Sequence, residues 1–262
     1  LAEGGTPLLK DDDQWVRLDV SVDILPSYGY LADLAVDPQW NVVVMPQWSD
    51  EGYLLYVLND GGTPLDVTDD AWIGAGSNAN GVGRYLRFDA DGGGWIGTVN
   101  GLWYWDDQGT RLEPSDDTWT WVSANVLAEG TALYGLDVSQ PHAAWIALGD
   151  GRIAFLDHGG TPSDPSDDRW AFYGTAEGVA AFAGGRHLAA EGDRLWMKGE
   201  DGVAQLDTAG TPFDPSDDSW WIIHAQEQIV SPYVMDIDVA PRGGAWISSS
   251  SGGITYAVVD PG

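Results

Sequence analysis

The sequence predicts an all-β protein, a five-bladed β-propeller, from three observations. A thirteen-residue acidic segment occurs five times, a hairpin pattern of short apolar runs recurs between the copies, and no stretch has the apolar period of an amphipathic helix. Successive copies begin 57, 47, 51 and 50 residues apart. A period near 50 indicates a repeat architecture, and four short strands repeated radially form a propeller.

The acidic segment, called the acidic loop below, has the same frame in every copy. Gly-Thr stands at positions 3 and 4, Asp-Asp at positions 10 and 11, and Trp at position 13. The copies read EGGTPLLKDDDQW (3–15), DGGTPLDVTDDAW (60–72), DQGTRLEPSDDTW (107–119), HGGTPSDPSDDRW (158–170) and TAGTPFDPSDDSW (208–220). Glycine, proline, serine and aspartate at such spacing are typical of turns, so the frame is expected to join two strands.

The hairpin pattern is clearest in GGWIGTVNGLWYWD, residues 93–106. Two apolar runs flank an Asn-Gly turn, which is a strong β-hairpin signal. Another apolar run precedes the hairpin at 85–88, and a fourth follows the acidic loop at 119–122. Each repeat is therefore an inner strand, a hairpin pair, an acidic loop and an outer strand. The whole chain is expected to be one domain, with blades at about 30–76, 82–123, 132–174, 179–224 and 232–258.

The two ends of the chain complement each other. Residues 1–20 contain an acidic loop and an outer strand with no inner strands before them, whereas the last repeat ends after three strands. We expect residues 14–20 to complete the last blade, which would close the ring and leave no unpaired edge.

Ten tryptophans recur at equivalent positions and are predicted to pack between blades, because a large apolar ring with one N–H donor suits such an interface. Five end the acidic loops and five hold the equivalent place in the second strand: Trp15, Trp72, Trp119, Trp170 and Trp220, and Trp40, Trp95, Trp145, Trp196 and Trp246.

Composition excludes several functions. With 41 acidic and 11 basic residues, the net charge of −30 argues against binding nucleic acid or an anionic membrane surface. The absence of cysteine excludes disulfides, cysteine-based zinc sites and a thiol nucleophile. No apolar run is long enough to span a membrane, and no signal peptide is recognised. Because the chain begins at Leu1, a processed form or a fragment is left open.

The acidic loops contain 21 of the 41 acidic residues, counting Asp106, Asp157 and Asp207 just ahead of three of them. A propeller gathers loops of one kind on one face, and like charges about 4 Å apart repel by roughly 4 kcal/mol near a surface. Calcium prefers six to eight oxygen ligands, so the sequence predicts several calcium ions in these loops. Two alternatives stay open: the carboxylates form Asx-type turns, or they make a solubilising surface.

The predicted calcium ligands are the carboxylates of four loops, the first loop being weakened by Lys10. They are Asp60, Asp66, Asp69 and Asp70; Asp107, Glu113, Asp116 and Asp117; Asp157, Asp164, Asp167 and Asp168; and Asp207, Asp214, Asp217 and Asp218.

The opposite face is the predicted ligand-binding face, because its hairpin turns and blade connections differ from blade to blade. Trp48 is the main candidate there, although packing on its own blade is equally open. The predicted set is Trp48, Asn100, Asp150, Glu200, Ser250, Tyr30, Arg84 and Tyr233.

No catalytic residues are predicted. The four histidines do not recur among the repeats, and the chain has no G-x-S-x-G, H-E-x-x-H or phosphate-loop motif. Paired carboxylates can serve a glycosidase, but a pair repeated five times suits structure or metal binding better.

The segment GGWIGTVNGLWYWD and its lead Asp89–Gly93 resemble the repeat of the two-component regulator propeller family, G-x-x-W-I-G-T…G-L-x-x-[YW]-D. This resemblance implies a propeller in an extracellular or periplasmic setting. The function expected is non-enzymatic binding, adhesion or sensing, with a protein or glycan as ligand. The alternatives are an assembly protein whose acidic ring docks a partner within a larger assembly and, more remotely, a propeller lyase or glycosidase.

Overall fold

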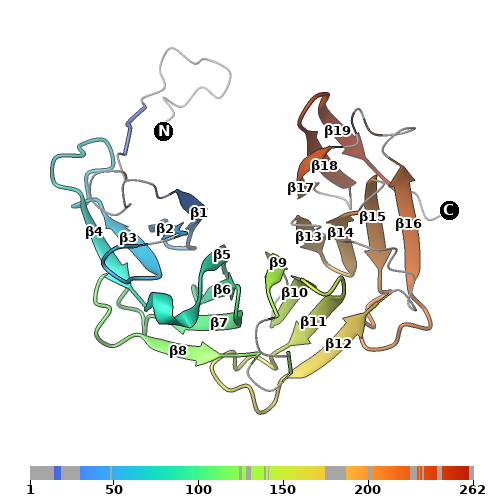
Figure 1. The fold of residues 1–262 in the computed structure, drawn as a ribbon, viewed down its shortest axis with the longest axis horizontal. Helices are drawn as coiled ribbons and strands as arrows, with labels where there is room; N and C mark the ends of the chain where they lie inside the picture. The colour runs from blue at the N-terminus through green and yellow to red at the C-terminus, as the bar shows by residue number, and fades with distance from the viewer. Residues whose placement is uncertain are drawn as a thin grey trace.

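The computed structural model describes residues 15–18, 30–47, 49–123, 126–127, 131–138, 140, 142–174, 187–199, 202–224, 229, 231, 233–240 and 244–259. Five antiparallel sheets stand side by side around a central space, with their innermost strands toward the centre (Figure 1). The described residues contain one 3-10 turn, Asn78–Asn80, and no α-helix. The predicted all-β, five-bladed propeller is confirmed.

In the first four blades, strand order from inside to outside follows the sequence. Blade 1 has β1 (Leu31–Val36), β2 (Val42–Pro46), β3 (Leu55–Asn59) and β4 (Ala71–Ala75), and blade 2 has β5 (Gly83–Phe88), β6 (Gly94–Thr98), β7 (Gly101–Asp106) and β8 (Thr118–Trp121). Blade 3 has β9 (Leu133–Asp137), β10 (Ala143–Leu148), β11 (Ile153–Asp157) and β12 (Arg169–Tyr173), and blade 4 has β13 (Leu188–Glu191), β14 (Arg194–Lys198), β15 (Gly202–Asp207) and β16 (Ser219–His224). Blade 5 has β17 (Val234–Ala240), β18 (Gly244–Ser249) and β19 (Gly253–Ala257).

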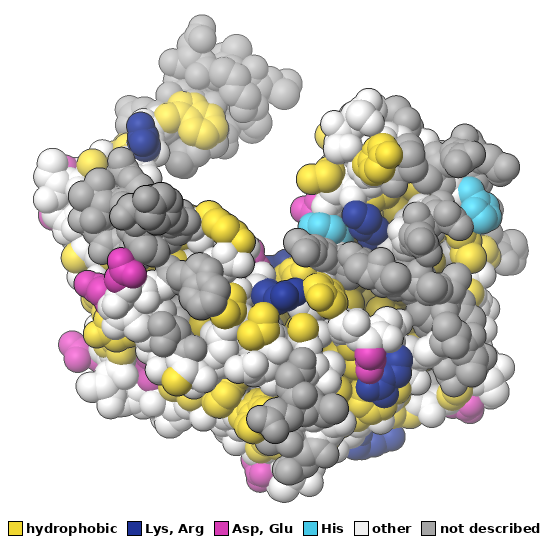
Figure 2. All heavy atoms as spheres, in the orientation of Figure 1, with side chains coloured by type: hydrophobic (Ala, Val, Ile, Leu, Met, Phe, Trp, Pro, Cys, Tyr) yellow, Lys and Arg dark blue, Asp and Glu magenta, His cyan; other side chains and the backbone are white. Residues whose placement is uncertain are grey.

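The closing strand is the part of the prediction that the described residues do not show. Blade 5 has three strands, and Trp15–Leu18 lie outside any strand. Figures 1 and 2 show an opening between blade 5 and blade 1, so the described blades form an arc. Residues 14, 19 and 20 of the expected strand lie outside the described residues. The edge of β19 is therefore unpaired among the described strands, and Trp15 is largely exposed.

The core lies between successive blades. Trp95, Trp145 and Trp196 occupy the same place on β6, β10 and β14, are at most 1% exposed, and each packs against the following blade. The interblade role predicted for these three tryptophans is confirmed. Trp246 holds the same place on β18 but is 50% exposed, because no described blade follows blade 5.

The alignment of Trp40 with these tryptophans is wrong. Trp40 lies in the β1–β2 turn with φ of 71° and is 85% exposed. Val43 pairs with Ala35 in the register where Trp95 pairs with Arg87, so Val43 is the true equivalent. The first repeat fills this interblade position with the smaller side chain of Val43, and Trp40 lies three residues before it.

The tryptophans that end four acidic loops start the outer strands and are partly buried. Trp119 stacks on Trp105 of the neighbouring strand β7, with ring centroids 5.6 Å apart and planes 11° from parallel. This packing fixes the far end of the loop to its blade.

Backbone hydrogen bonds define the two faces of the arc. On one face the hairpin turn of a blade joins the residue before its inner strand, as when Ser250 N donates to Tyr233 O. On the other face the acidic loop joins the turn between the first two strands, as when His158 N donates to His142 O. The fold thus collects the acidic loops on one face.

Candidate functional site

A central cavity of about 390 Å³ is lined by the inner strands of all five blades. This volume lies in the range of small-ligand sites, roughly 300–1,000 Å³. Figure 2 shows basic side chains at the centre of the arc, facing the opening. The charged lining consists of Asp33 and Asp137, Arg84 and Arg87, His187, and Asp236 and Asp238.

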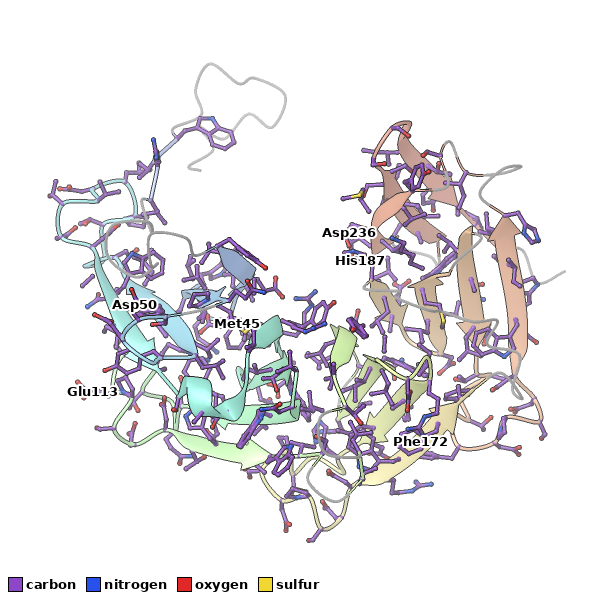
Figure 3. The ribbon with its side chains drawn as sticks, viewed as in Figure 1. Met45, Asp50, Glu113, Phe172, His187 and Asp236 are labelled. Atoms are coloured by element: carbon purple, nitrogen blue, oxygen red, sulfur yellow. The ribbon has the colours of Figure 1, made fainter. Side chains whose placement is uncertain are left out.

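Contacts between neighbouring inner strands hold several of these side chains. Arg87 Nη1 lies 2.8 Å from Asp33 Oδ2, an oxygen that also accepts the backbone N–H of Leu86. His187 Nδ1 lies 3.1 Å from Asp236 Oδ1, and Figure 3 shows these two side chains facing the central space. The first pair joins blades 1 and 2, and the second joins blades 4 and 5, so the lining is ordered by the blade arrangement itself.

Two charged side chains of the cavity, Arg84 and Asp238, take no part in an ion pair among the described residues. Arg84 lies over the ring of Tyr134, 4.7 Å from its centroid, and has no carboxylate partner within the described part of the chain. Asp238 has no hydrogen-bond or ion-pair partner among the same residues and is exposed. The lining contains four carboxylates against two guanidinium groups and one imidazole, so negative charge exceeds positive charge in the cavity.

Of the predicted ligand-binding residues that the structure describes, Arg84 alone lines this cavity. Tyr30 and Tyr233 are exposed just before β1 and β17, on the predicted face. Asn100, Asp150 and Ser250 lie in hairpin turns of three different blades and do not converge, and Asp150 pairs with Arg152 at 2.7 Å. Trp48 and Glu200 lie outside the described residues.

Sequence reasoning missed the other charged cavity residues. Their signal is a polar residue inside an otherwise apolar inner strand, as in LADLAV for Asp33 and VMDIDV for Asp236 and Asp238. In a propeller the inner strand of every blade borders the central channel, so such residues meet there although they are far apart in sequence.

The described acidic loops share one hydrogen-bond frame. The position 4 threonine hydroxyl donates to the position 10 carboxylate in each loop, at 2.7–3.0 Å: Thr63 to Asp69, Thr110 to Asp116, Thr161 to Asp167, and Thr211 to Asp217. The position 7 aspartate accepts the backbone N–H two residues later in three loops, at 3.1 Å: Asp66 from Thr68, Asp164 from Ser166, and Asp214 from Ser216. Most loop carboxylates therefore shape turns, as one of the two alternatives to calcium proposes.

The aspartates at the loop starts also accept a backbone N–H from two residues later. Asp60 and Asp107 accept from Gly62 and Gly109, and Asp157 and Asp207 accept from Gly159 and Ala209, at 2.9–3.0 Å. Glu113 replaces the position 7 aspartate, and its side chain makes no hydrogen bond of this kind within the described residues.

The aspartates at position 11 do not take part in these turn hydrogen bonds. In Asp117, Asp168 and Asp218 both carboxylate oxygens are buried and have no hydrogen-bond partner among the described residues. Burial, followed by neighbouring carboxylates such as Asp167 beside Asp168, raises the pKa of each to about 6, and at Asp117 the nearby Trp105 indole partly offsets this. Asp70 is partly exposed, and desolvation followed by the neighbouring carboxylates, Asp69 first, also raises its pKa.

No three His, Asp or Glu side chains converge as a metal site anywhere in the described part of the chain. The predicted calcium sites are therefore not preformed in the described loops. Calcium binding stays a prediction, and the three unpartnered carboxylates are the groups that would gain most from a cation.

Comparisons with known proteins were made at the levels of sequence and structure. No family model and no curated protein matches this chain. Its fold is similar to that of PorZ, a surface component of the type-IX secretion system of Porphyromonas gingivalis, with a TM-score of 0.63 and 14% identity over 86% of this chain. The chain spans about one third of PorZ, 32% of its length.

Two further solved structures show the same fold. An inactive H270A form of virginiamycin B lyase from Staphylococcus aureus, solved with quinupristin, matches 88% of this chain and 70% of its own, with a TM-score of 0.56 and 12% identity. YCF48 bound to D1 peptide matches 93% of this chain and 66% of its own, with a TM-score of 0.58 and 12% identity. At these identities the likeness establishes the propeller fold, which is what the resemblance to the two-component regulator repeat also implied. Among the described residues no helix is long and apolar enough to cross a membrane.

Proposed function

We propose that this chain is a non-enzymatic binding propeller that holds a basic segment of a partner protein in its central cavity. The observation that carries the proposal is the acidic lining of that cavity, in which Asp238 has no described partner and Asp236 faces the same space. A lysine or arginine side chain supplies the donor that the Asp238 carboxylate lacks, and it can pair with Asp236 from the side that His187 does not occupy.

The charge of the whole chain supports the same class of partner. A net charge of −30 steers basic molecules toward the protein and repels acidic ones. The similarity to YCF48, which was solved with a peptide, is consistent with peptide binding on this fold. The extracellular or periplasmic location expected from the repeat resemblance is part of the proposal, and detection of the chain in fractions of its native cells tests it.

A peptide array tests the partner class. Wild type is compared with Asp236→Asn/Asp238→Asn and with Asp66→Asn/Asp164→Asn, a control that removes the same charge from exposed positions on the acidic-loop face. We expect wild type and control to retain lysine- or arginine-containing peptides, and the cavity variant to bind them at least tenfold more weakly. Equal binding by the two double variants, or a preference for acidic peptides, would contradict the proposal.

One observation favours a second candidate, a lyase. His187 is held by Asp236 at 3.1 Å inside the cavity, the arrangement that orients a histidine as a general base. The similar virginiamycin B lyase is inactive when one histidine is replaced. Incubation of the protein with quinupristin, followed by mass spectrometry, separates the two candidates: turnover lost in His187→Ala would replace the binding proposal, and we expect no turnover.

A further inference from the structure

A second cavity lies on the acidic-loop face, between blades 1 and 2. Its volume is about 470 Å³, within the range of small-ligand sites. Three segments form it: the β1–β2 turn with Gln39 and Asn41, the β5–β6 turn at Asp91–Gly93, and the start of the acidic loop with Asp106 and Asp107. It shares no lining residue with the central cavity.

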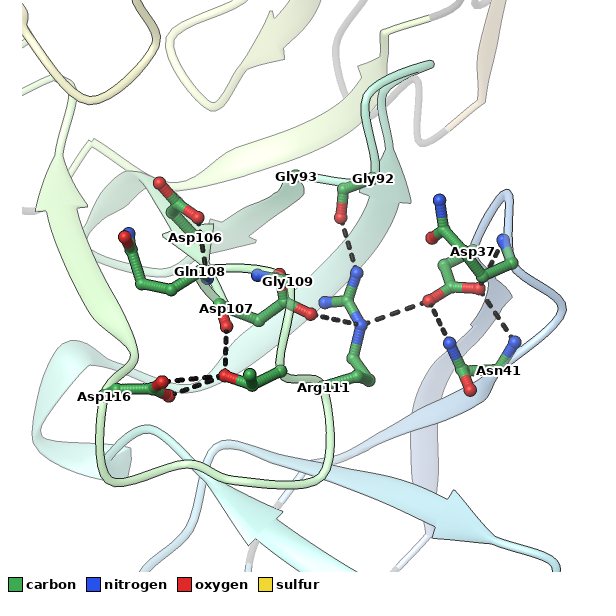
Figure 4. Close-up of polar contacts among 12 residues, drawn as sticks. Asp37, Asn41, Gly92, Gly93, Asp106, Asp107, Gln108, Gly109, Arg111 and Asp116 are labelled. Atoms are coloured by element: carbon green, nitrogen blue, oxygen red, sulfur yellow. Dashed lines mark hydrogen bonds and ion pairs between the residues drawn. The ribbon is translucent and has the colours of Figure 1, made fainter.

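Arg111 lines this cavity. It stands at position 5 of its acidic loop, where the other four loops have proline. Its side chain is 7% exposed. Nε lies 3.0 Å from Asp107 Oδ2 and 3.1 Å from Asp37 Oδ2, and Nη2 donates to Gly92 O at 2.6 Å (Figure 4). Nη1 is buried and has no hydrogen-bond partner in the described part of the chain. Arg111 therefore has donor capacity left after its structural contacts are made.

The other polar lining groups offer mainly acceptors. Neither the Asp91 carboxylate nor the Gln39 amide has a hydrogen bond or ion pair among the described residues. Asp106 uses Oδ1 to accept the backbone N–H of Gln108 at 2.9 Å, which leaves Oδ2. The side of Tyr104 provides an aromatic wall.

Glycines form part of this cavity and are required there. A Cβ on Gly93 would lie 2.0 Å from the Tyr104 hydroxyl, and Gly92 has φ of +95°, a conformation that favours glycine. The backbone can come this close to the cavity because neither residue carries a side chain.

These groups narrow the ligand class by charge and by hydrogen bonding. An anion would meet Asp91, Asp106 and Asp107, while Arg111, the one basic side chain among the described lining residues, is already paired with two carboxylates. A simple cation would satisfy the carboxylates but offer no acceptor to Arg111 Nη1. A hydroxyl group both donates and accepts, so neighbouring hydroxyls can satisfy both kinds of group at once. We propose that this cavity binds a neutral carbohydrate through its hydroxyl groups.

A glycan array followed by calorimetry on the best hit tests the proposal. The variants are Asp91→Ala and Gln39→Ala, whose side chains make no hydrogen bond or ion pair among the described residues, and the control is Asp50→Ala, an exposed aspartate in a hairpin turn on the opposite face (Figure 3). We expect wild type and Asp50→Ala to bind a neutral saccharide equally, and each cavity variant to bind it at least tenfold more weakly.

The charge of the sugar provides a second measurement. The uronic acid that corresponds to the best neutral sugar should bind at least tenfold more weakly, because its carboxylate meets the acidic lining. The proposal is overturned if no neutral saccharide on the array binds, if the cavity variants bind like the control, or if the acidic sugar binds as well as the neutral one.

Discussion

Replacing Arg111 with methionine should destabilise the fold strongly. The change keeps an apolar stem but removes the guanidinium that pairs with Asp37, whose side chain is fully buried. Breaking a buried pair by removing one partner costs about 3–5 kcal/mol, because a buried charge is left uncompensated. Asp37 would still accept hydrogen bonds from Gln39 N and from Asn41 N and Nδ2, at 2.7–2.9 Å. We therefore expect Arg111→Met to lower the free energy of unfolding by about 3 kcal/mol, the low end of this range.

The control is Arg152→Met, which breaks the ion pair with Asp150. That pair is shorter, 2.7 Å, but its side chains are 42% and 44% exposed. Exposed pairs contribute about 0–1 kcal/mol, so this variant should differ little from wild type. The comparison separates the effect of burial from that of distance, since the shorter contact is predicted to matter less.

The assay is urea unfolding followed by circular dichroism, with free energies of unfolding taken from the midpoints at a common slope. Asp37→Asn and the double variant complete a cycle. Residues in direct contact typically couple by about 0.5–3 kcal/mol, so the double variant should lose clearly less than the sum of the single losses. A loss for Arg111→Met no larger than for Arg152→Met, or strict additivity, would refute the reasoning.

Three further predictions concern the loops and the core. Because its folded pKa is raised to about 6, Asp168 destabilises the fold as pH rises from about 4 to above 6. At pH 7, Asp168→Asn should therefore have a free energy of unfolding about 1 kcal/mol higher than wild type, after allowance for partial solvent screening, and a higher melting temperature. At pH 4 the two proteins should melt alike. Asp70→Asn should change the melting temperature little at either pH. If calcium binds the loops, melts at matched ionic strength should be higher in calcium chloride than in EDTA, and identical melts would leave turn chemistry as their role. Trp196→Ala should cost about 3–5 kcal/mol in urea unfolding, while a similar loss for the half-exposed Trp246→Ala would contradict the interblade account.

The sequence by itself determined the repeat and the order of strands. The Gly-Thr, Asp-Asp and Trp positions of the acidic loop and the apolar runs of the hairpin are local patterns, and local patterns fix turns and strands. The interblade role of Trp95, Trp145 and Trp196 was also readable, because a residue repeated in every blade meets the same neighbours in every blade. Trp40 fails this reasoning because residue type was matched without the register that places Val43 in the strand.

Tertiary structure alone decided which polar residues meet. Asp33, His187 and Asp236 come from three blades and share the central cavity, and Arg111 reaches Asp37 across 74 positions of sequence. It also decided which loop carboxylate is buried, since in residues 157–170 three carboxylates make turn hydrogen bonds inside this segment, whereas Asp168 is buried without a described partner. Burial and contacts between blades depend on how blades are packed side by side, and a repeat pattern specifies each blade without specifying what its variable side chains will face.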